Sequence, residues 1–535
     1  MSRSPLGLAC AVVVALAVPL TGAAQNEGAH GHDAAPAVRA GVKLGTIRFP
    51  TSAKGAAQAD FIEGVLYLHS FEYESARDAF RRAQRKSPAF ALAYWGDAQS
   101  WNHPVWNQRN ADSARAALAR LAPTAAERAA RAPSAREKAW LNTVEVLYGD
   151  GPKPRRDSLY LRSMEALALA HPDDESRTFL ALAWLGLNQG DRRVSDYMRA
   201  GAIAQRVLEH SPDHPGAAHF VIHAFDDPEH AVLGLDAARA YSGIAPGAAH
   251  AQHMTTHIFL ALGMWPESNA QNRIAHAASN GRSGHYLQWL AYGLQQEGRF
   301  RDAAALLDSV RASIGRPGWR LGTALASVRA AYVVDRDDWT LARDPALLAS
   351  NAEDRMSSLL DAWLYGMGAA RRHDTTATGA ALARARALDV AMRASGQTPP
   401  GDRLVAAALV QLVEGADAAQ RGDTARALDH LRSAQASFDA APVAFGPPTT
   451  PLLVGEYRAE VLLAAGRAAE AKAVLQDALR QNPGRSRSLA LLVRAAMAAG
   501  DLQAADAARA QLARNWANAD DGGARLRALA LSGAP

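Results

Sequence analysis

The chain has almost no sulfur chemistry. It contains one cysteine among its 535 residues, Cys10, which lies in an apolar stretch near the N-terminus. A disulfide framework, a thiolate metal site and a cysteine nucleophile are therefore excluded from the rest of the chain. The sequence also has no phosphate-binding glycine loop, no GxSxG nucleophile elbow and no HExxH zinc motif. Enzyme classes that depend on these motifs are not indicated.

Aromatic residues are scarce as well, at 7% of a chain that is 49% hydrophobic and 21% charged. Alanine is abundant, and alanine forms helices well but packs poorly on a pleated surface. This composition argues against a sandwich or a barrel, and no segment has a convincing strand pattern. The sequence therefore predicts an all-α protein.

The chain has no dense block of charge of one sign. Its formal net charge of +5 arises from arginines scattered among Asp and Glu. This pattern is typical of a solvated surface, so we expect no nucleic-acid partner.

Long apolar runs are confined to the N-terminus. Beyond the segment 1–24, no apolar run approaches the roughly 20 residues that a membrane-spanning helix needs, and we expect no membrane span. Residues 1–24 have Arg3, an apolar run from Leu6 to Leu20 and a small-residue end, which is the pattern of a secretory signal peptide. Cys10 precedes most of the apolar run and so is not placed as a lipoprotein cysteine. The sequence predicts a periplasmic or secreted protein.

Residues 25–56 are rich in Ala, Gly and Pro and predict a flexible leader. His30 and His32 in this segment would bind metal weakly, because ordering a mobile segment costs conformational entropy.

A repeat begins at Ala57. Small, aromatic and turn residues follow at positions 8, 11, 20, 24, 27 and 32 of this unit: Gly64, Tyr67, Ala76, Phe80, Ala83 and Pro88. The segment resembles the tetratricopeptide repeat, a pair of antiparallel helices with a period of about 34 residues. The resemblance implies a right-handed α-α superhelix, in which each helix pair packs only against its neighbours.

The same frame recurs in units that start at Ala181, Pro215 and Leu452, and it blurs between about 300 and 440. Degenerate helix pairs are expected there. The proline-rich segment FGPPTTP, 445–451, predicts a loop that reorients the last repeats. We therefore divide the mature chain into an α-solenoid over 57–445 and C-terminal repeats over 446–535.

Six of the seventeen histidines lie between 219 and 265, and four of them form two HxxxH pairs. His219 and His223 form the first pair, and His253 and His257 follow one repeat period later. Residues four apart share one face of a helix. The resemblance to tetratricopeptide repeats implies that all four face the concave groove, where they can share one metal ion or two.

Further candidates for the groove are His69 and His103, which are also one repeat period apart, with Trp95 nearby. His285 begins the helix that follows the second pair, and His250 lies near a helix start. Asp226 follows the first pair and can act as an oxygen ligand or as a second-layer acceptor that orients an imidazole.

Bland explanations exist for several of these residues. His210, His214 and His276 fit half-buried, hydrogen-bonded surface histidines, and capping or turn contacts account for His230 and His250. Duplication of one ancestral unit can also preserve the in-phase histidines without any metal. Glu456 and Glu460 fall at the same two repeat positions near the C-terminus and predict an acidic groove for a basic ligand.

An imidazole-rich, thiol-free site suits zinc, copper or iron, and the ligand type alone does not choose among them. The chain resembles exported bacterial tetratricopeptide-repeat proteins with a motif like HAxHMxxHIFxxLGxW, here His250 to Trp265. Three hypotheses follow. The groove binds a protein, peptide or small-molecule ligand around a histidine-coordinated metal; the same cluster serves a metal-dependent hydrolase or oxidoreductase; or the solenoid is a metal-free interaction scaffold.

Overall fold

The structure is a computed structural model, and it describes residues 42–187, 192–281, 283–313, 322–343, 354–442 and 445–531. The predicted signal peptide, and the leader up to residue 41 with His30 and His32, lie outside the described residues.

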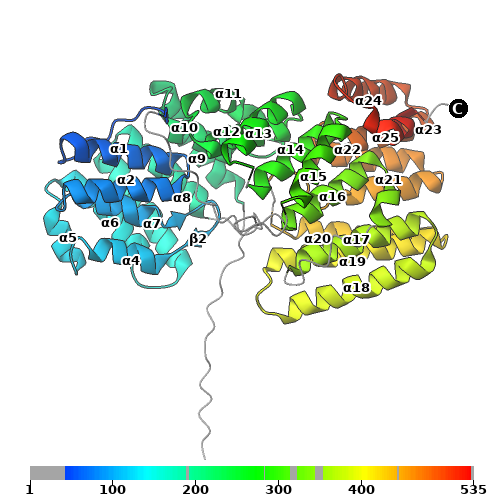
Figure 1. Ribbon diagram of the computed structural model, residues 1–535, viewed down its shortest axis with the longest axis horizontal. Coiled ribbons are helices and arrows are strands. Elements are labelled where there is room, and N and C mark those ends of the chain that lie inside the picture. The colour runs from blue at the N-terminus through cyan, green and yellow to red at the C-terminus, as the bar shows by residue number, and fades with distance from the viewer. Residues whose placement is uncertain are drawn as a thin grey trace, which may run out of the picture.

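Helices dominate the described chain (Figure 1). The first half contains α1 (Gly55–His69), α2 (Tyr73–Lys86), α3 (Ala91–Gln99), α4 (Ala111–Ala119), α5 (Ala125–Arg131), α6 (Ala135–Leu147), α7 (Lys153–Ala170), α8 (Asp174–Leu187), α9 (Val194–His210), α10 (Pro215–Ala224), η1 (Ala231–Gly234), α11 (Leu235–Ile244), α12 (Ala249–Ala261) and α13 (Trp265–Ala278).

The second half contains α14 (Gly284–Gln296), α15 (Phe300–Arg311), α16 (Gly322–Arg336), η2 (Trp339–Arg343), α17 (Arg355–Arg371), α18 (Thr375–Ala394), α19 (Pro400–Gln420), α20 (Thr424–Asp439), α21 (Val454–Ala464), α22 (Ala468–Gln481), α23 (Ser486–Ala498), α24 (Leu502–Asn515), η4 (Asp521–Gly523) and α25 (Ala524–Leu531). The described residues of the blurred region between about 300 and 440 are thus largely helical, as expected.

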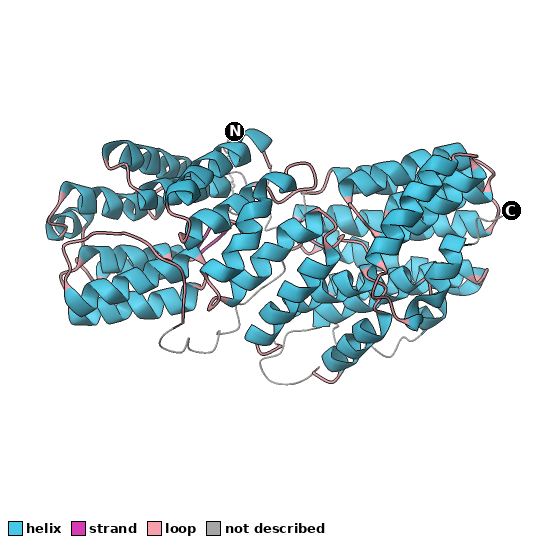
Figure 2. Ribbon diagram, turned by 90° about the horizontal axis from the view of Figure 1, so that it is seen from above, coloured by secondary structure: helices cyan, strands magenta, loops and turns pink. Residues whose placement is uncertain are grey.

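A short hairpin, β1 (Asn102–His103) and β2 (Gln108–Arg109), is the exception to the helical pattern among the described residues (Figure 2). No helix in the described ranges has both the length and the apolar character needed to cross a bilayer.

Helices pack in consecutive pairs, such as α1 with α2, α12 with α13 and α19 with α20. Small residues at the repeat positions permit the close approach: the ring of Phe80 lies where a Cβ on Gly64 or Gly96 would stand. Gly466 and Gly500, with φ of 75° and 76°, end α21 and α23 in the left-handed conformation that glycine adopts without strain. The all-α, tetratricopeptide-like solenoid is confirmed.

Two apolar core clusters organise the solenoid, one spanning residues 44–261 and the other 287–530. Helices α10 to α14 lie between the two ends of the molecule (Figure 1). The domain boundary that the sequence suggested at residue 445 does not coincide with the division between these clusters. Residue 445 instead lies in a loop within the second half.

The segment 42–54 is packed rather than flexible, which corrects the C-terminal part of the predicted leader. Phe49 is 2% exposed and contacts Phe61, Trp95 and Trp140. The backbone N–H of Thr46 donates to the carbonyl of Asp213 at 2.9 Å. The physical reason is the burial of a large aromatic side chain, which the Ala- and Gly-rich composition of the segment concealed.

In the first half, the segment 42–54 and α1 pack against helices that come later in the chain. Helix α1 contacts α10 directly, and the Tyr241 hydroxyl in α11 donates to Ser70 just after α1. The first helix of the chain therefore packs against helices that come much later in the sequence, and the side chains between α1, α10 and α12 lie in the protein interior.

The second half closes through a buried ionic network. Arg485, 0% exposed, donates to Asp335 on α16 at 2.8 Å and to Glu456 on α21 at 2.7 Å. Arg487 pairs with Asp337 and Glu460. The acidic groove predicted from Glu456 and Glu460 is thus occupied by the protein's own arginines, which come from the start of α23.

Candidate metal centre

Six histidines gather where α10, α12 and α14 meet. They form two groups of three, in each of which one nitrogen per imidazole lies within 4.8 Å of the others. The first triad is His219, His223 and His250, and the second triad is His253, His257 and His285. The four HxxxH histidines are therefore divided two and two, and His250 and His285 complete the sets.

The first triad has one imidazole with a defined tautomer. Nδ1–H of His219 donates to the backbone carbonyl of His69 at 2.6 Å. Nε2 therefore carries the lone pair, and this buried atom has no hydrogen-bond partner. Such a second-layer acceptor on the far nitrogen is the usual arrangement of a metal-binding histidine.

His223 follows one helical turn later, with its ring centroid 4.7 Å from that of His219. Its Nε2 is also buried without a hydrogen-bond partner. The ring of His250, from the start of α12, lies 5.0 Å from that of His219. Two helices thus bring three imidazoles to one point.

In the second triad, both HxxxH histidines are oriented by side chains. Nδ1–H of His257 donates to Asp226 at 2.6 Å, and Nδ1–H of His253 donates to Oδ1 of Asn272 at 2.9 Å. Their Nε2 atoms then face each other at 3.1 Å. An ion about 2.05 Å from both nitrogens would make an N–metal–N angle of about 98°, which suits metal coordination.

His285, at the start of α14, is the third member of the second triad and is half-buried. Its ring lies 4.5 Å from that of His253. Trp289, one turn along α14, packs 4.3 Å from His257. Gly446, at φ 98°, lies against Trp289 with no room for a Cβ, so the 445–451 loop covers this wall.

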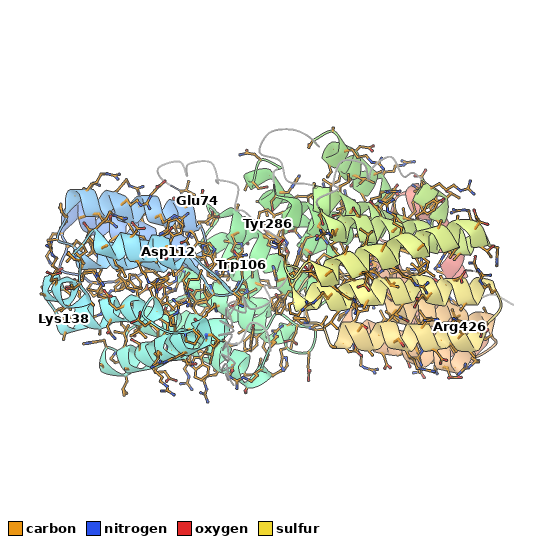
Figure 3. The ribbon with its side chains drawn as sticks, turned by 90° about the horizontal axis from the view of Figure 1, so that it is seen from below. Glu74, Trp106, Asp112, Lys138, Tyr286 and Arg426 are labelled. Carbon is orange, nitrogen blue, oxygen red and sulfur yellow. The ribbon has the colours of Figure 1, made fainter. Side chains whose placement is uncertain are left out.

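The two triads adjoin each other. The rings of His223 and His257 are 6.2 Å apart, and those of His250 and His253 are 6.4 Å apart. Trp106 contacts the first triad through His250, and Tyr286 contacts the second through His253. Figure 3 shows these two aromatic residues near the middle of the molecule.

Burial determines the charge of the first triad. Burial, with smaller contributions from neighbouring imidazoles, lowers the pKa of His219 to about 3 and the pKa of His223 well below its ordinary value. Both side chains are therefore neutral at pH 7, with lone pairs ready for a metal ion.

The groove geometry implied by the repeat resemblance needs correction. His219 and His253 are 0% exposed, His257 is 3% exposed and His223 is 8% exposed, so these four lie inside the protein. The closure of the first half by α1 and the packing of α14 against α13 cover the inner helix face. The histidines lie in the protein interior between helices rather than in an open groove.

A third group lies beside the first triad and consists of His69, Glu175 and His214, all at most 1% exposed. His69 donates from Nε2 to Glu175 at 2.8 Å, and His214 lies 3.3 Å from the other carboxylate oxygen. Nδ1 of His214 accepts from the N–H of Ala217 and so caps α10.

These contacts define the state of the third group. Burial alone would raise the pKa of Glu175, but the contacts with His69 and His214 hold it at about 2. Burial lowers the pKa of His69. The contacts with the two imidazoles keep the Glu175 carboxylate ionised. His69 thus supports the metal centre through its carbonyl, which orients His219.

The remaining predicted residues lie elsewhere. His103 is in β1, stacked on Tyr73 at 3.9 Å. Trp95 is 0% exposed in an aromatic cluster and donates to Thr143, so it is a core residue rather than part of the groove wall. Asp226 is within reach of one imidazole, as the second-layer acceptor described above.

Among the histidines given bland explanations, His210 is exposed and bonded to its own helix, and His230 pairs with Asp227. His214 is different, because it is buried against Glu175 instead of lying half-buried at the surface.

Three residues of the site escaped the sequence analysis: Asn272, Glu175 and His214. Glu175 and His214 come from α8 and the start of α10, and a carboxylate in an otherwise apolar helix face is the signal that would have indicated Glu175. Asn272 on α13 has no comparable signal, since polar residues on a second repeat helix are common.

A separate small cavity of about 20 Å³ is lined by Tyr292, Asp335 and Arg485 and by prolines of the 445–451 loop. This volume holds about one water molecule. It accompanies the ionic network and does not reach the size of a ligand site.

Comparison with known proteins identifies no family. No family model matches the sequence, and no curated protein matches it. Among solved structures, the human IFIT1 dimer with PPP-AAAA is similar at 13% identity over 86% of this chain and 91% of that chain, with a TM-score of 0.36. The APC/C hetero-tetramer Cut9-Hcn1 is similar at 12% identity over 91% of this chain and 78% of that chain, with a TM-score of 0.32. Overlap at this level says nothing about the metal centre.

Proposed function

We propose that this protein is an exported α-solenoid that binds a transition metal, zinc, copper or iron, at the two histidine triads between α10, α12 and α14. Residues 1–24, with their signal-peptide pattern, support export. The binding of a protein, peptide or small-molecule ligand next to the metal belongs to the same proposal. The ligand would approach at His285, which is half-buried.

One observation carries the proposal. Nε2 of His253 and Nε2 of His257 lie 3.1 Å apart, while their Nδ1 atoms contact Asn272 and Asp226. When both Nδ1 atoms carry the protons, the two Nε2 lone pairs face each other, and a cation between them removes their repulsion. In the first triad, the buried Nε2 atoms of His219 and His223 have no hydrogen-bond partner and are likewise available to a cation.

A metal-dependent enzyme is the second candidate function. It is favoured by the number of protein ligands, because each triad supplies three imidazoles. Sites with four protein ligands are structural, whereas sites with three keep a position for water or substrate. A hydrolase or an oxidoreductase would use that position, and access past His285 would admit a small substrate.

Elemental analysis tests the proposal. The full chain is expressed without an affinity tag, isolated after export and analysed for zinc, copper and iron, beside the double variant His219→Ala/His257→Ala and the control His210→Ala. The wild type and the control are expected to contain metal, and the double variant to lose it.

A melting experiment completes the test. The chelator-treated wild type should gain thermal stability when its metal is returned, since a ligand that binds only the folded state stabilises it. If the wild type contains no metal and none of the three ions raises its Tm, the proposal is wrong, and a metal-free scaffold is the function left.

A further inference from the structure

We propose that the two triads hold a pair of copper ions, one per triad, as a single dinuclear centre. This inference rests on the proposed function and adds the identity and number of the ions. It follows from the continuity of the six imidazoles, from the charge of their donor atoms and from the number of ligands in each triad.

Continuity is visible in the ring distances. Within the second triad, His257 and His285 are 6.4 Å apart. Across the boundary, His223 and His257 are 6.2 Å apart, and His250 and His253 are 6.4 Å apart. These separations exceed the 4.5–5.0 Å between most of the neighbouring rings in one triad, but they place the two triads side by side, so two ions placed in the triads would be adjacent.

Sequence geometry explains the pairing. His219 and His223 lie on α10, and their repeat counterparts His253 and His257 lie on α12. The third ligand comes each time from the start of the next inner helix, with His250 on α12 and His285 on α14. Two consecutive repeats therefore build the same three-imidazole site, side by side.

The donor charge selects the metal. Both triads consist of imidazoles, which carry no charge when they coordinate a metal, and the nearest carboxylate partner, Asp226, binds Nδ1 of His257 rather than offering an oxygen to the ion. Two adjacent divalent ions would place four positive charges in the protein interior, which is costly without anionic ligands. Copper can occupy such a site as a singly charged ion.

Ligand type points the same way. Imidazole is a ligand that suits copper. Iron and manganese sites draw on carboxylate oxygens, which neither triad provides. Zinc remains the competing ion, and the experiment separates the two.

The neighbouring group of His69, Glu175 and His214 does not form a third copper site. Nε2 of His69 is bonded to Glu175, and His214 is engaged at both nitrogens, by the N–H of Ala217 and by Glu175. Three of its four imidazole nitrogens are thus engaged, and Nδ1 of His69 is the one without a hydrogen-bond partner.

The test is an anaerobic titration of the metal-free, untagged protein with Cu(I), in competition with a coloured copper chelator. We expect two copper ions per chain in the wild type and in His210→Ala. His223→Ala, which damages the first triad, and His285→Ala, which damages the second, should each retain one. Circular dichroism checks that each variant keeps its helical content.

Chemical oxidation of the Cu(I)-loaded wild type, followed by electron paramagnetic resonance, gives a second readout that needs no variant. Two adjacent Cu(II) ions interact through their magnetic dipoles, so the spectrum should be broadened relative to that of one isolated Cu(II) ion. Each triad variant that folds should show the signal of one isolated Cu(II) ion.

Three results overturn the inference. One copper per chain, lost from both variants, would mean a single ion shared by the triads. Two magnetically independent Cu(II) ions would mean separate sites. Displacement of copper by equimolar zinc would reject copper while leaving the proposed metal-binding function intact, whereas failure to bind either ion would reject both.

Discussion

Nε2 of His253 faces Nε2 of His257 at 3.1 Å, one helical turn apart on α12. Asp226 and Asn272 hold the opposite nitrogens. The pair is therefore oriented through its Nδ1 atoms and has its Nε2 atoms close together, an arrangement that suits a shared metal ion.

The second layer should matter for affinity. Asp226→Asn removes the charge that makes His257 a more basic ligand, and we expect the metal affinity to fall about 10- to 100-fold. The measurement is a competitive titration against a chelator of known affinity.

Asp227→Asn is the matched control for this change. The Asp227 carboxylate contacts His230 and Arg192 rather than either triad. Equal affinities of the two variants would show that Asp226 does not support the ligand.

Metal should stabilise the fold. The metal-loaded protein at a free ion concentration 100 times the Kd should be more stable by about 2.7 kcal/mol than the metal-free protein. Denaturant unfolding with and without a chelator measures the difference. The variant His253→Ala should show a much smaller gain, and an equal gain would place the bound ion elsewhere.

Glu175 should make stability depend on pH in the acidic range. Its pKa is about 2 in the folded chain, because its contacts with His69 and His214 outweigh burial, and it is ordinarily higher in an unfolded chain. The stabilisation is then fully present above pH ~4.5 and is lost as the pH falls toward 2.

Glu175→Gln removes the ionisable group, so the slope of stability against pH between 5 and 3 should be shallower than in the wild type. Guanidinium unfolding at a series of pH values measures both slopes. Parallel slopes would contradict an ionised Glu175 in the folded protein.

Arg485 should be essential to the second half. Arg485→Ala leaves Asp335 and Glu456 buried without their shared cation, and we expect a loss of about 3–5 kcal/mol. Arg480→Ala, an exposed arginine on the preceding helix that pairs with Asp477, should cost less than about 1 kcal/mol. Urea unfolding of the two variants makes the comparison, and equal stabilities would argue against a structural role of the network.

Local sequence signals predicted much of the fold and of the candidate site. Repeat spacing placed His219 with His223 and His253 with His257 on equivalent helices, and the small residues around Phe80 identified the helix pairs. These features depend on contacts within one repeat or between neighbours, which periodicity records.

Contacts between segments far apart in the chain were not predicted. The docking of Phe49, the burial of Trp95 and the contact of His69 with His219 join segments far apart in the chain, so no period reveals them. The same long-range contacts bury the histidines that were expected to face an open groove. The pairing of Glu456 with Arg485 also depends on the long-range packing of the solenoid.

The most direct test of the account is the metal content of the untagged, exported protein, measured by elemental analysis beside His219→Ala/His257→Ala. The account predicts bound metal in the wild type and its loss in the double variant. A wild-type protein that carries no zinc, copper or iron, and takes up none when these ions are added, would contradict it.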